Sequence, residues 1–151
     1  MSNKVLIING PNLNLLAKRN PAIYGAVGLK EIEKDCKILA KQINLETTFY
    51  QSNSEAELID FIHQAIDNVD GIIINAGAYT HSSIAIRDAL EIFQGAKIEL
   101  HISNIFKREE FRHNSYLSSV VDALISGLGV DGYSIALLAI NNILNKKKCK
   151  S

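Results

Sequence analysis

The chain has 151 residues, of which 47% are hydrophobic and 21% charged, a balance that predicts one globular domain spanning residues 1–151. Its 16 Lys and Arg residues equal its 16 Asp and Glu residues, so no net field favours nucleic acid or an anionic membrane as a partner. Two cysteines set no disulfide framework, and no apolar run is long enough for a membrane span or a signal peptide, so we expect a reduced, cytoplasmic setting.

Strand-like and helix-like patterns alternate along the chain. In chain order, we predict a strand at 5–8, a helix at 29–43, a strand at 46–51, a helix at 54–69 opened by the capping box SEAE, a strand at 71–75, a helix at 82–93, strands at 97–102 and 122–126, and a helix at 133–144. Five strands with intervening helices predict an α/β fold, in which helices cover both faces of a parallel sheet. The link 103–121 is the one long irregular crossover, and such a loop is usually functional.

Polar side chains follow three of the predicted strands. The segment 9–12 (NGPN) follows the first strand, 75–81 (NAGAYTH) the third, and 101–104 (HISN) the fourth. In open parallel sheets, ligands bind at the carboxyl ends of the strands, near the point where the strand order reverses. We therefore predict that these three segments converge on one crevice, which is the candidate site.

Two histidines belong to this crevice. The period of a strand places Glu99 and His101 on one face, where the carboxylate orients the imidazole and favours its protonated form. The pair is either structural or functional, and its position at the crevice favours function. His81 is either a hydrogen-bonding residue at a helix start or a substrate ligand. We expect His63 and His113 to be exposed.

Other kinds of site fit the crevice poorly. His81 and His101 have no i,i+4 partner and the crevice contains no cysteine, so the sequence indicates no metal site. The segment 126–132 (SGLGVDG) is not the strand-to-helix elbow of serine hydrolases. It also lacks the spacing of a dinucleotide fingerprint, so a tight turn is its expected purpose.

The remaining candidates are cations and one phenol. The charged run 106–113 either faces solvent or sends Arg108 or Arg112 inward to an anionic substrate. Arg19 is similarly ambiguous. Tyr24 is a poor base at neutral pH unless a cation stabilises its phenolate, so from the residues alone it is a packing residue or a base.

Six segments together resemble the type II 3-dehydroquinate dehydratases. They span nearly the whole chain in order and are NGPNLNLL (9–16), RNPAIYG (19–25), QSNSEAELIDFIH (51–63), NAGAYTHSSIAIRDAL (75–90), ELHISNIFKREEFRHNSY (99–116) and GLGVDGYSIAL (127–137). The resemblance implies a flavodoxin-like three-layer sandwich with a five-stranded parallel sheet. It also implies dehydration of 3-dehydroquinate to 3-dehydroshikimate through an enolate, without a metal or an organic cofactor. Ala17 and Asn20 depart mildly from the family pattern.

The resemblance assigns catalytic roles. Tyr24 is implied to be the base that takes the C2 proton, with its phenolate favoured by Arg19 and Arg108. Asn12 is implied to hold a water that stabilises the enolate oxygen. His101, oriented by Glu99, is implied to protonate the departing hydroxyl.

The resemblance also implies how the substrate and the subunits are held. The lid is the segment 19–24, and subunits form trimers, commonly four of them in a dodecamer, with Asp88 near a neighbouring site. The residues expected to bind substrate hydroxyls and the carboxylate are Asn75, His81, Arg112, Ile102 and Ser103.

Two other classes of protein with this fold are a nucleotide-binding module and a receiver-like interaction domain. The first would need a phosphate-cradling loop after the first strand, which the segment 11–13 (PNL) does not provide, and the second would need an acidic cluster at the strand ends, where the first and third strands have asparagine instead.

Overall fold

The structure, a computed structural model, describes residues 1–20, 22 and 27–150. Its strands form one sheet in the order β2-β1-β3-β4-β5, and every neighbouring pair is parallel. This order is that of flavodoxin-like folds, so the predicted fold class is confirmed. The strands are β1 (Asn3–Asn9), β2 (Leu45–Gln51), β3 (Gly71–Asn75), β4 (Ala96–His101) and β5 (Ala123–Ser126), close to the predicted ranges.

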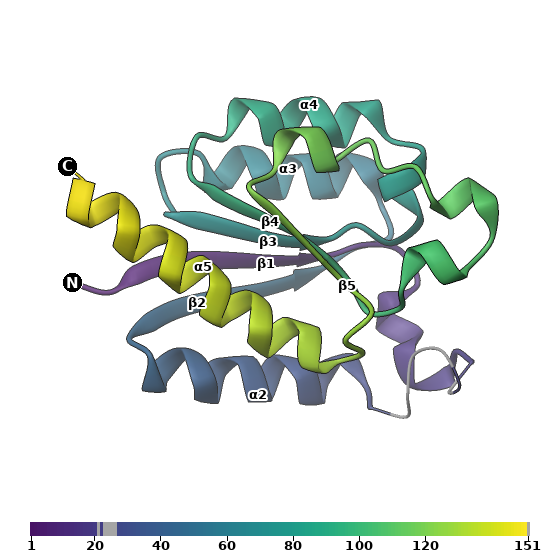
Figure 1. Cartoon of the computed structure of the whole chain (residues 1–151), viewed down its shortest axis with the longest axis horizontal. Coiled ribbons are helices and arrows are strands. Elements are labelled where there is room, and N and C mark those ends of the chain that lie inside the picture. Colours follow the sequence, from purple (N-terminus) through teal and green to yellow (C-terminus); the bar gives the residue numbers. More distant parts are fainter. Residues whose placement is uncertain (21, 23–26, 151) are drawn as a thin grey trace.

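Helices cover both faces of the sheet and make a three-layer sandwich (Figure 1). On one face lie α2 (Leu29–Gln42) and α5 (Asp131–Lys150), and on the other lie α3 (Glu55–Ala65) and α4 (Ile84–Ile92). A hydrophobic core lies on each face of the sheet, and successive residues of β1 belong to the two cores alternately, because side chains alternate across a strand. Val5 and Ile7 join the core under α2 and α5, whereas Leu6 and Ile8 join the core under α3 and α4.

On the α3 and α4 face, two helix boundaries differ from the prediction by two residues or more. The second predicted helix ends at Ala65, four residues early, because the backbone of Ile66 is already extended (ψ 126°). Ile66 and Val69 still pack against the core, but from a turn. The third begins at Ile84 because Ser83 is its N-cap and accepts a hydrogen bond from the backbone N–H of Ile86.

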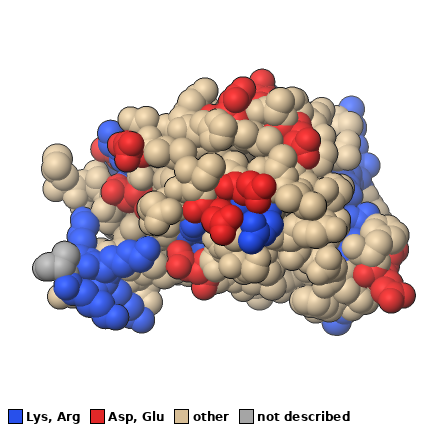
Figure 2. All heavy atoms as spheres, turned by 90° about the horizontal axis from the view of Figure 1, so that it is seen from above, with Lys and Arg blue, Asp and Glu red and all other residues tan. Residues whose placement is uncertain are grey.

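The C-terminal helix is longer than predicted. It begins at Asp131 and continues to Lys150, so the lysine run at 146–148 lies on its last turns, where cations suit the helix dipole. Basic side chains gather at this end of the molecule (Figure 2). No helix in the described part of the chain combines the length and apolar character needed to cross a bilayer.

The irregular crossover contains three short 3₁₀ helices: η3 (Ile105–Lys107), η4 (Glu110–Arg112) and η5 (Ser118–Val120). Two more follow β1 and β3, namely η1 (Leu13–Lys18) and η2 (Gly77–His81). Of these, η1, η2 and η3 begin near the carboxyl ends of β1, β3 and β4. They therefore bring the polar residues of the sequence together at that edge of the sheet.

Candidate active site

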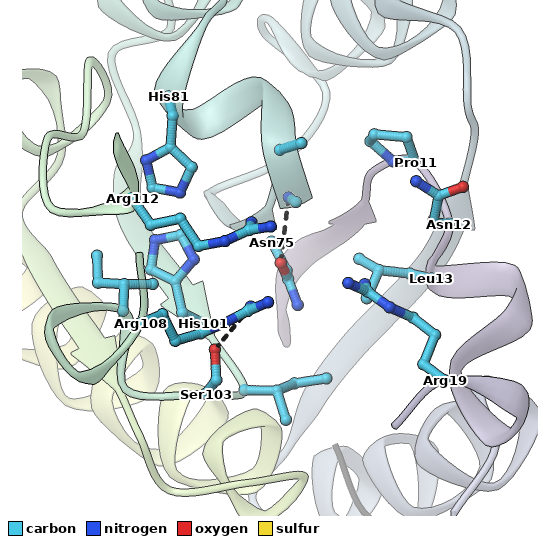
Figure 3. A pocket seen from close by; sticks show the side chains of 14 residues that line it. Pro11, Asn12, Leu13, Arg19, Asn75, His81, His101, Ser103, Arg108 and Arg112 are labelled. Carbon is cyan, nitrogen blue, oxygen red and sulfur yellow. Dashed lines mark hydrogen bonds between the residues drawn. The ribbon is translucent and has the colours of Figure 1, made fainter. Parts of the chain in front are cut away.

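A cleft lies at the carboxyl ends of β1, β3 and β4, at the predicted position (Figure 3). About 580 Å³ of space in and above the cleft, open solvent included, is not filled by protein atoms. The predicted residues that line it are Asn12, Arg19, Asn75, His81, His101, Ile102, Ser103, Arg108 and Arg112. The sequence therefore identified most of the wall.

Two predicted residues, Asp88 and Glu99, do not line the cleft, and for a third the structure gives no placement. Tyr24 is outside the residues that the structure describes. Asp88 is on α4, where its side chain is 60% exposed and pairs with Arg87. Glu99 lies behind His101 and is completely buried, so it can act on a bound molecule only through the histidine.

The predicted pair of Glu99 and His101 is confirmed. Both residues are buried at the end of β4, and Nε2 of His101 lies 2.5 Å from Oε2 of Glu99. A carboxylate accepts hydrogen bonds and does not donate, so Nε2 of the histidine is the nitrogen that carries a proton in this contact. Nδ1 is then the ring nitrogen left to exchange a proton with a ligand in the cleft.

Two serines complete the surroundings of Glu99, and the sequence did not predict them. Ser115 Oγ donates to Oε2 at 2.9 Å and Ser118 Oγ donates to Oε1 at 2.7 Å. Burial alone would raise the pKa of the Glu99 carboxyl. Hydrogen bonds from His101, Ser118 and Ser115 outweigh that effect, so the net pKa of Glu99 lies below its ordinary value. The carboxylate is therefore held ionised inside the protein.

His81 makes a hydrogen bond to the backbone and also lines the cleft. Its Nδ1 lies 2.8 Å from the backbone oxygen of Asn114, and its ring stacks on that of His101 with centroids 6.1 Å apart. Burial lowers the pKa of His81, and the neighbouring His101 and Arg112 lower it further. The ring is therefore neutral near pH 7, with Nδ1–H donating to Asn114. Its Nε2 can then accept a hydrogen bond from a ligand hydroxyl.

Three guanidinium groups enter the same cleft. Arg19 approaches from η1, while Arg108 and Arg112 come from the crossover, and all three point toward the central space (Figure 3). Arg108 donates to the Ser103 hydroxyl at 3.3 Å, and Nε of Arg112 binds Glu109 at 2.7 Å. Of the two orientations that the sequence left open, Arg108 and Arg112 both take the inward one. So much positive charge in one cleft suits an anionic substrate.

A buried polar network holds Asn75, which lines the cleft. The hydroxyl of Tyr133 donates to Oδ1 of Asn9 at 2.6 Å and accepts from Nδ2 of Asn75 at 3.1 Å. Asn75 Oδ1 also accepts from the backbone N–H of Gly77 at 3.3 Å. The sequence analysis identified Asn75 but missed Tyr133 and did not assign Asn9 a role. Tyr133 and Asn9 are 124 residues apart, so no local pattern links them.

The loop after β1 is fixed by its backbone. Gly10 is required because a Cβ there would lie 2.3 Å from the backbone oxygen of Ala76. Asn12 adopts a left-handed conformation (φ 69°), which asparagine tolerates better than most residues. The backbone N–H of Asn12 donates to Asn53 at 3.0 Å, and Asn53 in turn accepts from the hydroxyl of Tyr79 through its backbone oxygen at 2.9 Å. Asn12 is therefore presented at the cleft by a rigid turn.

Several other groups bear on the chemistry. Among residues 1–20, 22 and 27–150, no group of three or more His, Cys, Asp or Glu side chains could hold a metal ion. Lys97 donates its Nζ hydrogens to the carbonyl oxygens of Leu90 and Phe93, at the end of α4. This amine therefore caps a helix. His63 and His113 are exposed, as predicted.

Comparisons with known proteins agree with the motifs. The family model for dehydroquinase class II matches residues 3–141. A 3-dehydroquinate dehydratase from Bartonella henselae is 51% identical over 148 residues, which cover 98% of this chain and 100% of that protein. Another from Carboxydothermus hydrogenoformans is 50% identical over 144 residues, covering 95% and 94%. The crystal structure of type II dehydroquinase from Butyrivibrio crossotus, at 46% identity, has a TM-score of 0.91 and covers 93% of this chain and 98% of that one. The chain therefore belongs to the class II dehydroquinase family.

Proposed function

We propose that the protein dehydrates 3-dehydroquinate to 3-dehydroshikimate through an enolate, with Tyr24 as the base and His101 as the acid. One observation carries the proposal: a buried, ionised Glu99 holds His101 at the wall of a cleft into which three arginines point. The substrate is a hydroxylated carboxylate, so its charge and its hydroxyls both match this wall. The family relationship supports the same substrate.

In the first step, Tyr24 as phenolate removes the C2 proton, α to the ketone, and the electron pair passes to the ketone oxygen. A phenol is mostly protonated at neutral pH, and bringing its pKa from about 10 to about 7 requires roughly 4 kcal/mol. The guanidinium groups of Arg19 and Arg108 would supply this stabilisation in a cleft closed to water. Asn12 would hold the water that hydrogen-bonds to the enolate oxygen.

In the second step, the enolate collapses and expels the hydroxyl at C1. Protonated His101 gives its proton to this oxygen, so the leaving group departs as water and the new double bond is conjugated with the ketone. Glu99 stabilises the protonated ring before the transfer and keeps Nε2 occupied. Nδ1 is therefore the nitrogen that delivers the proton.

The other wall residues would bind the substrate. We assign its hydroxyl groups to Asn75, His81 and Arg112. Its carboxylate would lie on the backbone amides of Ile102 and Ser103 and on the Ser103 hydroxyl. The neutral His81 suits this role because its Nε2 is an acceptor, whereas a protonated ring could only donate.

Three further features stay proposals. The segment 19–24 would close over the substrate as a lid and exclude water. Subunits would assemble as trimers, commonly four in a dodecamer, and the exposed Asp88 would then reach a neighbouring site. We also propose that residues 1–151 act as one domain and work in the cytoplasm.

The direct test is an absorbance assay for the conjugated enone formed from 3-dehydroquinate. The purified protein should produce it at a rate far above that of substrate alone, and the His101→Ala variant serves as the matched control. Protein that is folded by circular dichroism but forms no enone would refute the proposed function.

A further inference from the structure

One short stretch of the crossover contacts both histidines of the cleft. The NSYLS segment (residues 114–118) offers the backbone oxygen of Asn114 to Nδ1 of His81 at 2.8 Å. The hydroxyl groups of Ser115 and Ser118 donate to Glu99, the carboxylate that holds His101. None of the six segments that carry the family resemblance spans this whole stretch, and no motif assigned these serines a role.

The hydrogen bonds around the hydroxyl of Ser115 allow only one orientation of its hydrogen. Its oxygen accepts from the backbone N–H groups of Leu117 at 3.1 Å and Ser118 at 3.2 Å. Its single hydrogen is therefore available to Oε2 of Glu99, 2.9 Å away. Because the oxygen of Ser115 accepts from two fixed backbone donors, the rotation of its hydroxyl group is fixed and its hydrogen points at the carboxylate.

Ser118 fixes the other oxygen of the same carboxylate. Its hydroxyl donates to Oε1 of Glu99 at 2.7 Å, whereas Ser115 and His101 both contact Oε2. A carboxylate that is bound at one oxygen only can rotate about its last side-chain torsion, which is broad. Hydrogen bonds at both oxygens remove that rotation, so the plane that receives His101 is set by the two serines.

The segment that presents the serines is itself anchored. Leu117, which lies between them, is completely buried in the core under α3 and α4. The backbone N–H of Tyr116 donates to the backbone oxygen of Thr80 in η2 at 3.0 Å. The hydroxyl groups therefore come from a backbone that is held in place at both sides.

We propose that Ser115 and Ser118 are positioning residues for the dehydration, which fix the Glu99 carboxylate and through it aim His101 at the leaving hydroxyl. This inference rests on the proposed function. Neither serine is among the described residues that line the cleft, so the two hydroxyls act on the rate of the chemical step and leave substrate binding to the wall. A purely structural role would instead show as a loss of stability with unchanged turnover.

Ser118→Ala is the first test, because residue 118 is exposed apart from its hydroxyl contact and the variant should fold. A hydrogen bond to a charged group changes an equilibrium by roughly tenfold to a hundredfold. Since His101 keeps its own contact with Glu99, we expect kcat to fall by about tenfold to thirtyfold and KM to change by less than about twofold. Ser118→Thr keeps a hydroxyl and should recover kcat to within about threefold of wild type.

Ser119→Ala is the matched control, since it removes the neighbouring exposed hydroxyl. It should leave kcat and KM unchanged. Ser115→Ala should lower kcat in the same way as Ser118→Ala, and it provides a second measurement if the first variant does not fold.

The outcomes separate this inference from the one beneath it. If the wild-type enzyme is active and the kcat of Ser118→Ala lies within twofold of the wild-type kcat, the positioning role is overturned and the proposed function stands. A threonine variant as slow as the alanine variant, or a loss confined to KM, would overturn it as well. Wild-type protein without enone formation would overturn both proposals.

Discussion

Replacing Glu99 by glutamine tests the acid half of the mechanism with the least disturbance. The two side chains have the same shape, and glutamine can keep its oxygen toward His101 and Ser115 while its NH₂ group donates to the oxygen of Ser118. His101 and both serines then keep a partner on this side chain, and only the second amide hydrogen of the glutamine lacks one. The variant removes the negative charge and little else, so its free energy of unfolding should stay within about 1 kcal/mol of wild type.

The magnitude follows from the distance between the charges. A carboxylate and an imidazolium whose charge centres lie about 4 Å apart attract by roughly 4 kcal/mol at the effective dielectric of a protein site. Converting charge-assisted hydrogen bonds to neutral ones costs about 2 kcal/mol. A loss of about 2–4 kcal/mol corresponds to roughly 30- to 1,000-fold in rate. We therefore expect kcat to fall by about 30- to 1,000-fold.

The assay is kcat for enone formation by Glu99→Gln and wild type between pH 6 and pH 9. Glu46→Gln, an exposed substitution on β2 near the opposite edge of the sheet, is the charge-matched control. A Glu99→Gln variant whose kcat stays within threefold of wild type across this range would refute the proposed role of the carboxylate.

Four further predictions concern the remaining chemistry. Tyr24→Phe should retain fold and substrate binding but lose turnover by orders of magnitude, and near-native turnover would return Tyr24 to the packing residues. His101→Ala should cripple water loss yet permit slow exchange of the C2 proton with solvent, measured by deuterium uptake; wild-type rates of both would contradict its role. Activity should survive exhaustive chelation, and borohydride added with substrate should leave no adduct on any lysine by mass spectrometry. Because burial raises the pKa of Cys36 to about 12, a thiol reagent at pH 8 should label native protein at the exposed Cys149 and reach Cys36 only in denaturant, unless α2 opens.

The parts of the fold that follow from sequence are those with a local signal. The central strand β3 is fully buried and its sequence GIIIN is apolar up to the last residue, so its range was predicted without error. Glu99 and His101 were paired by the period of a strand, which needs only two positions. The helix α3 was extended too far because Ile66 and Val69 have helical spacing but pack from a turn, and spacing alone does not distinguish the two arrangements.

The parts of the site that the sequence could not give depend on tertiary contacts. Ser115 and Ser118 reach Glu99 only because the crossover folds back along η2, and a serine in a loop has no pattern that predicts such a path. In the sequence, Tyr133 is the first apolar residue of a predicted helix, and nothing in that pattern indicates that its hydroxyl donates to Asn9. The sequence indicated Arg108 and Arg112 as candidates but not whether they face the cleft, because a charged run in a loop normally faces water.

The close approach at Gly10 has a consequence for how this site can change. With no room for even a methyl group between the ends of β1 and β3, the asparagines at those ends keep one spacing whatever happens around them. Substitutions at Gly10 therefore cannot be used to reshape this part of the cleft for a different ligand. Changes that fit the cleft to another substrate, in nature or by design, therefore have to occur in η1 and the crossover, whose residues also line it.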